Sequence, residues 1–204
     1  MTISKSKSLY NKLIEVFPLS QSLTDLSHDE NNSQNFIESS SLVFNLDLLY
    51  TTCHFDNSLS NKRKTPDALF YSDSEDCLYM VEFKSGSFKP NDIRLKVYDA
   101  VNALFHFCMA HCIISNTADF LDINIKFCLI FRDEKEYSAS FLETLESTLH
   151  KNYVKDMEGI IIKKRISRFD PDQIATFIKR ATDGQITNII YHYKDTRSPT
   201  SHAA

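Results

Sequence analysis

The spacing of apolar residues in the first quarter of the chain predicts two helices separated by a polar stretch. Apolar side chains recur at helical spacing over residues 8–17 and stop at Pro18, which predicts a short amphipathic helix. Residues 20–35 are rich in Ser, Asp and Asn and predict a loop or a loosely held connector. A second apolar stripe at helical spacing over residues 35–51 predicts another helix.

The middle of the chain predicts a β-hairpin, a long helix and a buried strand. Residues 65–71 and 78–84 are two β-like runs on either side of an acidic turn. Pro90 opens the longest apolar helical face, which extends to Cys112. Residues 123–131 are almost wholly apolar and β-rich, as expected of a central strand that is buried on both faces.

The rest of the chain continues the alternation of helices and strands. The expected elements are a helix at residues 138–151, a strand at 159–166, a helix at 171–182, a strand at 186–193 and a disordered tail at 194–204. This order predicts an α/β protein with a mixed sheet flanked by helices and a C-terminal α/β extension. We expect a single domain at residues 35–193, preceded at residues 1–34 by an N-terminal helix and a polar connector.

Composition excludes several classes of protein. The chain has 204 residues, of which 42% are hydrophobic and 25% charged, enough for one folded domain with a sizeable core. Its formal net charge of -4 excludes a small, strongly basic nucleic-acid coat protein. Only 3 glycines occur, so the chain lacks the material for a Gly-rich phosphate loop or a dinucleotide-binding fingerprint.

The cysteines and the apolar runs bear on the compartment. The 5 cysteines are odd in number and form no C-x-x-C pair, which argues against a disulfide framework or a paired zinc knuckle. The first residues lack the unbroken apolar run of a signal peptide, and no stretch approaches the roughly 18 apolar residues of a membrane span. We therefore expect a soluble, cytoplasmic protein that does not act at a membrane.

The predicted hairpin brings two carboxylates together. Glu82 and Lys84 lie at positions i and i+2 of the second strand, so both side chains point to the same face. If the turn centres between Ser74 and Glu75, Asp67 on the first strand lies opposite Glu82. The Cβ atoms of directly opposed residues are about 5 Å apart. Two carboxylates then meet beside a lysine.

Facing carboxylates favour a metal site over a purely structural role. Like charges on paired strands repel, so a sequence selected only for stability would not place them together without a compensating cation. Mg²⁺ takes oxygen ligands and is commonly held by one or two carboxylates. Asp67, Glu82 and the backbone carbonyl of Phe83 supply such oxygens. The ammonium of Lys84 is suited to orient an attacking water and to neutralise charge that develops on a phosphate.

The motifs Pro66-Asp67 and Glu82-Phe83-Lys84, together with the order of the predicted elements, resemble the PD-(D/E)xK nuclease superfamily. The resemblance extends over residues 35–131. It implies a restriction-endonuclease-like core with the order α-β-β-β-α-β and catalytic roles for Asp67, Glu82 and Lys84. It also implies hydrolysis of phosphodiester bonds of nucleic acid, DNA more often than RNA, with Mg²⁺ or Mn²⁺ as cofactor.

The resemblance adds candidate ligands and substrate contacts. Many members of the superfamily place an acid on the first helix, and Glu38 matches that position, with Asp47 as the weaker candidate. A solvated helix residue is nearly as good an interpretation of Glu38. The long helix often carries a polar residue and a tyrosine one turn apart, and Arg94 and Tyr98 have this spacing. We expect both to contact the substrate.

Basic residues gather near the motifs although the chain as a whole is acidic. Lys64 precedes the first motif closely, and Lys89 lies between the second motif and the long helix. If the fold collects these cations, they form a basic groove for phosphates. We therefore expect Lys64 and Lys89 to contact nucleic acid, and the alternative for such residues is a solvated face.

Three hypotheses about function follow from the sequence. The first is a metal-dependent nuclease, and the second is a non-catalytic subunit of the same fold that binds nucleic acid or protein. The third is an unrelated α/β interaction protein in which both motifs are accidental. Cutting both strands of a duplex usually needs a second active site, which leaves a homodimer or a larger nucleoprotein complex open as the assembly.

Overall fold

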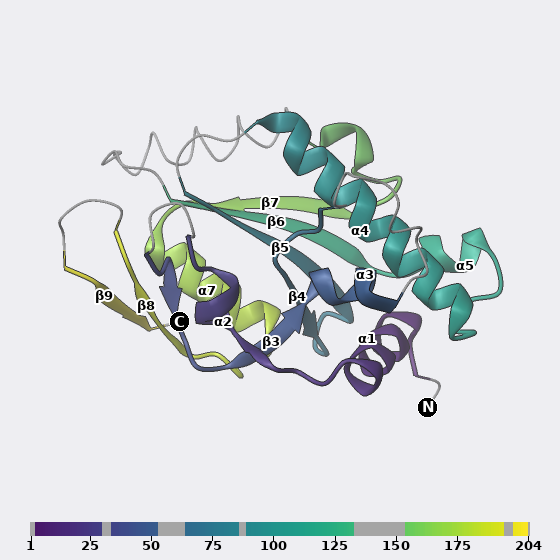
Figure 1. Ribbon diagram of the computed structural model, residues 1–204, viewed down its shortest axis with the longest axis horizontal. Helices are drawn as coiled ribbons and strands as arrows, with labels where there is room; N and C mark the ends of the chain where they lie inside the picture. The colour runs from purple at the N-terminus through teal and green to yellow at the C-terminus, as the bar shows by residue number, and fades with distance from the viewer. Residues whose placement is uncertain are drawn as a thin grey trace.

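The structure is a computed structural model that describes residues 3–29, 34–52, 64–85, 89–132, 154–193 and 198–203. Within these residues, six strands form a large sheet and three strands form a smaller one. Helices pack on both faces of the large sheet (Figure 1). The predicted α/β class, with a mixed sheet flanked by helices, is confirmed.

The large sheet is antiparallel on one side and parallel on the other. Its strands, in spatial order, are β1 (Gln21–Ser22), β3 (Leu42–Asn45), β4 (Ala68–Ser72), β5 (Cys77–Ser85), β6 (Ile125–Arg132) and β7 (Lys164–Arg168). Neighbours from β1 to β5 run antiparallel, whereas β5, β6 and β7 run parallel to one another. Parallel neighbours need a crossover connection, and helix α4 (Pro90–Ala110) supplies it between β5 and β6.

The helices divide the core into two layers. The helical elements besides α4 are α1 (Lys5–Val16), α2 (Leu23–Leu26), η1 (Leu46–Leu48), α3 (Leu49–Thr52), α5 (Thr117–Leu121), η2 (Lys155–Met157) and α7 (Pro171–Ala181). Helices α1 and α4 contribute to the core on one face of the large sheet, and α7 contributes to the core on the other. Both layers are built from large apolar side chains that are almost fully buried.

The central strand β5 presents alternate residues to these two layers. Met80 packs in the layer of α1 and α4, whereas Val81 packs in the layer of α7. Because side chains alternate along a strand, Glu82 and Lys84 point to the α4 side of the sheet. The strand thereby aims a carboxylate and an ammonium toward the helix that follows it in the chain.

Strands β4 and β5 form the predicted hairpin in the predicted register. The paired residues are Ala68 with Val81, Leu69 with Met80, Phe70 with Tyr79, Tyr71 with Leu78 and Ser72 with Cys77. Continuing this register by one residue places Asp67 opposite Glu82. Asp183, just after α7, fixes the turn by accepting hydrogen bonds of 2.8 and 2.5 Å from the hydroxyls of Ser72 and Ser74.

The predicted helix at residues 35–51 is wrong. This segment forms β2 (Ile37–Glu38) and β3, and then the short turns η1 and α3. Val43 packs in the α7 layer and Phe44 in the α4 layer, so β3 is buried on both faces. Such a strand shows consecutive apolar residues, which periodicity alone does not distinguish from a buried helix.

The polar connector predicted at residues 20–35 contains short regular elements. Strand β1 pairs with β3 at the edge of the large sheet. Helix α2 begins at a capping box, in which Ser22 and Asp25 each accept a hydrogen bond from the backbone of the other. Leu23 is completely buried in the α7 layer. The N-terminal segment is therefore part of the main core rather than a connector in front of it.

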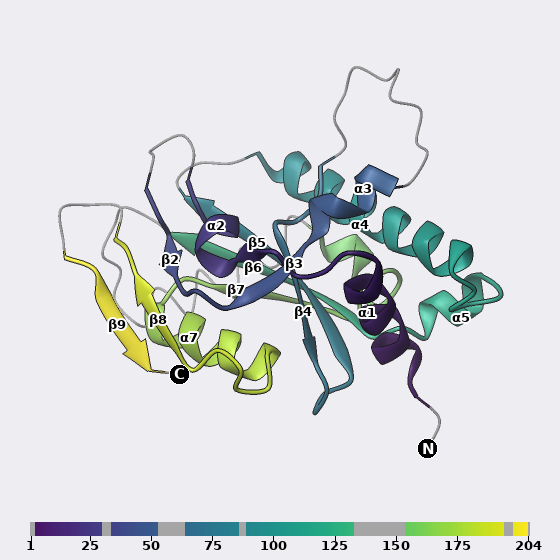
Figure 2. The ribbon, with the colours of Figure 1, turned by 60° about the horizontal axis from the view of Figure 1, so that its bottom comes forward.

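The tail predicted to be disordered also contains a strand. Residues Thr200–Ala203 form β9, which runs antiparallel to β8 (Asn188–Tyr191). Strand β8 also pairs with β2, which gives the smaller sheet the order β2-β8-β9 (Figure 2). The expectation of disorder is wrong for these four residues, because a polar edge strand depends on its backbone pairing and has no hydrophobic pattern to reveal it.

The remaining predicted elements differ in outcome. Helices α1, α4 and α7 and strands β6 and β8 are confirmed. The strand predicted at residues 159–166 begins later, as β7, because Gly159 has φ +79 and belongs to a turn. The helix predicted at residues 138–151 lies outside the described residues. None of the described helices is long and apolar enough to cross a membrane.

Candidate metal centre

The candidate site lies where β5 extends beyond β4. The pairing of β4 with β5 ends at Ala68 and Val81, whereas β5 remains paired with β6 as far as Ser85. Asp67, the residue before β4, occupies part of the space beside the end of β5. Its Oδ2 accepts a hydrogen bond of 2.7 Å from the backbone N–H of Phe83. A side chain thus continues the hairpin contact where the backbone ladder stops.

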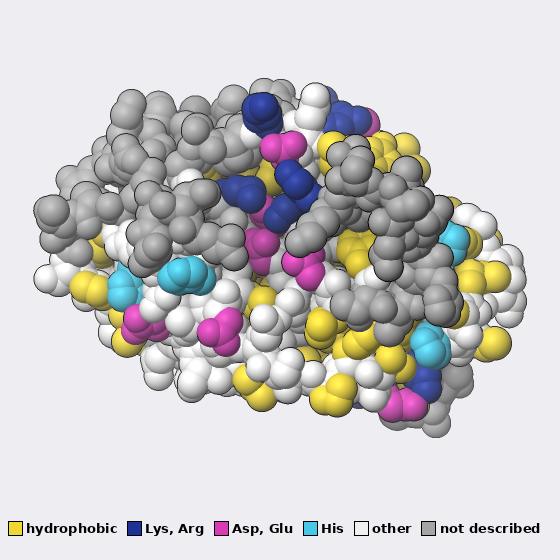
Figure 3. Space-filling view, in the orientation of Figure 1, with side chains coloured by type: hydrophobic (Ala, Val, Ile, Leu, Met, Phe, Trp, Pro, Cys, Tyr) yellow, Lys and Arg dark blue, Asp and Glu magenta, His cyan; other side chains and the backbone are white. Residues whose placement is uncertain are grey.

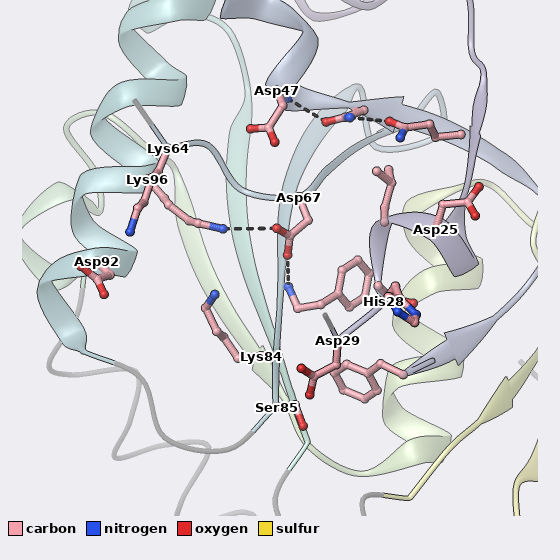
Figure 4. A pocket seen from close by; sticks show the side chains of 16 residues that line it. Asp25, His28, Asp29, Asp47, Lys64, Asp67, Lys84, Ser85, Asp92 and Lys96 are labelled. Atoms are coloured by element: carbon pink, nitrogen blue, oxygen red, sulfur yellow. Dashed lines mark hydrogen bonds and ion pairs between the residues drawn. The ribbon is translucent and has the colours of Figure 1, made fainter. Parts of the chain in front are cut away.

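Asp67 and Glu82 converge on the ammonium of Lys96, which belongs to α4. Nζ of Lys96 lies 3.2 Å from Oδ1 of Asp67 and 2.8 Å from each carboxylate oxygen of Glu82. Nζ of Lys84 lies 2.5 Å from Oε1 of Glu82. Figure 4 shows Lys84 and Lys96 on the same side of Asp67. The structure therefore brings the three residues predicted to be catalytic together and adds Lys96 to them.

Lys96 is the residue of this site that the motifs alone do not reveal. It lies three residues after Ile93 and four before Ala100, both completely buried on the core face of α4. Residues at these spacings are neighbours on a helix surface, so Lys96 lies at the edge of the apolar stripe. A lysine at the edge of a buried stripe, in the helix that follows two facing carboxylates, is the signal in the sequence that points to it.

Burial sets the electrostatics of the site. The side chain of Glu82 is 0% exposed, and burial together with the charge of Asp67 raises its pKa, against the opposing effect of Lys96 and Lys84. Burial also raises the pKa of Asp67, although Lys96 partly counteracts it. Burial by itself lowers the pKa of Lys96, but the two carboxylates outweigh it and the pKa is raised. Burial and mutual repulsion therefore favour the neutral form of the two acids, and the adjacent lysines favour their charged form.

Asp67, Lys84 and Lys96 line a cavity of about 540 Å³, whereas the completely buried Glu82 is not part of its lining. One side of it carries Lys64, Lys84 and Lys96 together with Asp92. The other side carries Asp25, His28 and Asp29, and Asp67 lies between the two sides (Figure 4). Figure 3, drawn in the orientation of Figure 1, shows Lys and Arg side chains next to Asp and Glu side chains in the middle of the visible surface. A cavity of this volume is in the range of small-ligand sites. Its lysine side is suited to a phosphate group.

The two acids expected to add a further ligand lie in different places. Asp47 belongs to η1, lines the cavity and accepts a hydrogen bond from the hydroxyl of Thr65. Glu38 lies in β2, outside the lining of the cavity, with its Oε1 2.9 Å from Nε2 of His192. The structure therefore does not bring Glu38 to the candidate site. Its expected position depended on a helix that does not form.

The four predicted substrate contacts also separate. Lys64 lines the cavity, whereas Lys89, Arg94 and Tyr98 do not. Successive residues of a helix are about 100° apart, so Arg94 and Tyr98, each two positions from Lys96, point away from the side of α4 that faces the cavity. Arg94 instead forms an ion pair of 2.7 Å with Asp156 of η2. The motif spacing was thus present in the sequence, but the helix turns it away from the site.

The donor set at this site fits a hard divalent cation. Asp67 and Glu82 already contact one common cation, the ammonium of Lys96, which marks a point within reach of both. The N–H of Phe83 is directed at Asp67, and the N–H and C=O of a strand residue point to the same side, so the Phe83 carbonyl faces the site too. Among the described residues, no group of three or more His, Cys, Asp or Glu is arranged to hold a metal. A metal here would rest on two carboxylates, one carbonyl and water, as Mg²⁺ commonly does.

Comparison with protein-family models, with curated proteins and with solved structures finds no match to this chain. The chemistry of the site therefore has to be inferred from its own residues.

Proposed function

We propose that this protein is a divalent-metal-dependent nuclease that hydrolyses phosphodiester bonds of nucleic acid, with DNA favoured over RNA. The observation that carries the proposal is the convergence of Asp67 and Glu82 on a single cation, with Lys84 2.5 Å from Glu82. Buried like charges are costly to assemble, and such groups with shifted pKa values concentrate at functional sites. A cavity with a lysine side adjoins them.

The order of the elements supports the same proposal. The longer elements α1, β3, β4, β5, α4 and β6 follow one another in the α-β-β-β-α-β order of a restriction-endonuclease-like core, with the short elements β1, α2, β2, η1, α3 and α5 between them. Helix α1 then takes the place predicted for a helix at residues 35–51. Asp67 and the run Glu82–Lys84 lie at the same end of the adjacent strands β4 and β5. This is the arrangement that the PD-(D/E)xK superfamily uses for its two motifs. Strand β7 and helix α7 extend that core.

The residues of the site have distinct roles in this mechanism. Asp67, Glu82 and the Phe83 carbonyl would hold Mg²⁺ or Mn²⁺, which would supply Lewis-acid polarisation and a more acidic water. Lys84 donates a hydrogen bond to the attacking water and offsets negative charge as it develops on the phosphate. Lys64, on the same side of the cavity, pairs with a phosphate of the nucleic acid and holds it in position.

The test is metal-dependent cleavage of supercoiled plasmid, single-stranded DNA and RNA. We expect cleavage with Mn²⁺, none with EDTA, and a loss of at least about 100-fold in Lys84→Ala. The matched control is Lys164→Ala, which removes an exposed strand lysine in β7 and should cleave like the unchanged protein. Equal cleavage by Lys84→Ala and Lys164→Ala would assign the activity to a contaminant and contradict the proposal.

One observation favours a second candidate function, a non-catalytic subunit of the nuclease fold that binds nucleic acid or protein. Lys96 and Lys84 together supply two positive charges beside the two carboxylates, so the charges of the site balance without a metal. In this case the lysine side of the cavity binds phosphate, and Mn²⁺ neither binds nor supports cleavage. Retention of nucleic-acid binding with no cleavage in any metal would favour this candidate.

A further inference from the structure

The ammonium of Lys96 occupies the place that a bound metal needs. It contacts both carboxylates at once, at 3.2 Å for Asp67 and 2.8 Å for Glu82. Mg²⁺ binds carboxylate oxygens at about 2.1 Å, so a divalent cation held by both acids would need the space that the ammonium fills. Two cations cannot share this position, because their cores overlap and their charges repel. Lys96 and a metal are therefore alternatives.

The contacts of Lys84 are different. Its ammonium contacts Oε1 of Glu82, and its side chain is 26% exposed, whereas that of Lys96 is 14% exposed. No contact between Lys84 and Asp67 is present, so Lys84 does not bridge the two acids. Both lysines contact Oε1 of Glu82, but of the two only Lys96 also contacts Oε2 of Glu82 and Oδ1 of Asp67. The two lysines of the site therefore have different relations to the metal position.

We propose that Lys96 is an exchangeable counter-ion: it holds Asp67 and Glu82 together in the metal-free protein, and metal binding displaces its ammonium into the cavity, where it binds a phosphate of the nucleic acid. This inference rests on the proposed function. Lys96 lines the cavity beside Lys64 and Lys84, and its stem is long and flexible enough for the ammonium to move there. Metal binding then frees the ammonium of Lys96 from the two carboxylates for contact with a phosphate, which couples metal binding to substrate binding.

The first test compares Mn²⁺ affinity in Lys96→Met, Lys84→Met and the unchanged protein by isothermal titration calorimetry. Methionine keeps the length and apolar character of the stem and removes the competing charge. We expect Lys96→Met to bind Mn²⁺ at least about tenfold more tightly, because the metal no longer displaces an ammonium, and Lys84→Met to change by less than about threefold. Equal affinities in Lys96→Met and the unchanged protein would overturn the inference and leave the metal site intact. Absence of Mn²⁺ binding in every form would instead contradict the proposed function.

The second test uses the unchanged protein and so does not depend on the folding of a variant. The side-chain ammonium signals of ¹⁵N-labelled lysines are followed by nuclear magnetic resonance while Mg²⁺ is added. An ammonium with several hydrogen bonds exchanges its protons slowly, so we expect a Lys96 signal in the metal-free protein that is lost on saturation with Mg²⁺. A Lys96 signal that persists unchanged after calorimetric saturation with Mg²⁺ overturns the inference.

The third test measures the coupling to substrate. Binding of a fluorescent single-stranded oligothymidylate is measured with Ca²⁺ and with EDTA. The measurements are made at low temperature and over short times, which avoids cleavage. We expect Lys96→Met to lower the affinity at least about fivefold with Ca²⁺ and less than about twofold with EDTA, because the ammonium faces the phosphate only when metal is bound. Equal losses in both conditions would show that Lys96 binds phosphate without being displaced, which overturns the exchange.

Discussion

Oδ2 of Asp67 accepts a hydrogen bond of 2.7 Å from the backbone N–H of Phe83, and this bond joins the ends of β4 and β5 where their ladder stops. The other oxygen of Asp67 faces Lys96. One carboxylate therefore has two separable tasks: it pairs with a backbone donor, and it contributes charge to the site.

Substitutions of Asp67 should separate these two tasks. Asparagine retains an acceptor for the Phe83 N–H, and alanine leaves that donor without one. We expect Asp67→Ala to be less stable than Asp67→Asn by about 1 kcal/mol, measured by urea denaturation, while both variants lose Mn²⁺ binding. Identical urea midpoints for the two variants would show that the hydrogen bond does not stabilise the hairpin.

The two acids that were candidates for an additional ligand should differ in activity. Asp47 lines the cavity, and Glu38 lies in the smaller sheet beside His192. We expect Asp47→Asn to lower Mn²⁺-dependent cleavage at least about tenfold and Glu38→Gln to leave it within about twofold. Initial rates on plasmid DNA provide the measurement. The opposite ranking would mean that the N-terminal segment moves when substrate binds.

The basic residues should likewise separate by their position on the molecule. Lys64 lines the cavity, whereas Arg94 pairs with Asp156 on the other side of α4. We expect Lys64→Ala to reduce the slope of log affinity against log salt by about 1, as the loss of one phosphate contact does. Arg94→Ala and Tyr98→Ala should leave the slope unchanged. A reduced slope in Arg94→Ala would place nucleic acid on the outer side of α4.

Arg132 should be a major contributor to stability. Its side chain is completely buried, and it donates hydrogen bonds of 3.0 Å to the backbone carbonyls of Asn35 and His192. We expect Arg132→Met to lower the free energy of unfolding by about 3 kcal/mol, because two partly buried carbonyls lose their donor. Arg180→Met, which removes a half-exposed arginine, should cost less than about 1 kcal/mol. Similar urea midpoints for the two variants would contradict this assignment.

Glu75 should make stability depend on pH. Burial alone raises its pKa, but Lys126, Tyr79 and Arg180 outweigh burial, and the pKa is lowered. A carboxyl group with a lowered pKa in the folded state stabilises the protein above its unfolded pKa of about 4.3 and loses that contribution as the pH falls through the folded value. We expect Glu75→Gln to cost about 1 kcal/mol at pH 7 and nothing measurable near pH 2.5. A constant difference between these pH values would show that the charge is not the cause.

The sequence predicts the hairpin and its two acids because the necessary information is local. A short turn fixes the register, and the register decides which side chains lie opposite each other, as the pairing of Tyr71 with Leu78 confirms. The position of Lys96 is a different matter. Its place at the edge of the apolar stripe is local, but whether that edge faces the carboxylates depends on how α4 packs across the sheet.

The errors have the same origin. Val43 and Phe44 are consecutive and buried on opposite faces of the sheet. The apolar pattern of such a strand is the same as that of a buried helix, and only the neighbouring strands distinguish the two. The prediction that Glu38 is a metal ligand was affected by the same error, because it assumed that Glu38 lies on that helix. Strand β9 is polar and depends on its backbone pairing with β8, which leaves no hydrophobic pattern to detect. In each case the deciding contact joins residues far apart in the chain.

The unequal pairing of β5 also bears on the motions of the site. Glu82 lies on a stretch of strand that remains paired with β6, from Glu82 with Leu129 to Ser85 with Arg132. Asp67 lies outside the β4 ladder and is held there by its side-chain hydrogen bonds with the Phe83 N–H and with Lys96. Local opening is easiest where few hydrogen bonds must break. We therefore expect Asp67 to swing aside in brief local openings while Glu82 stays in place until the sheet itself unfolds. Of the two carboxylates, Asp67 moves and Glu82 stays fixed, so cations enter and leave the site from the side of Asp67.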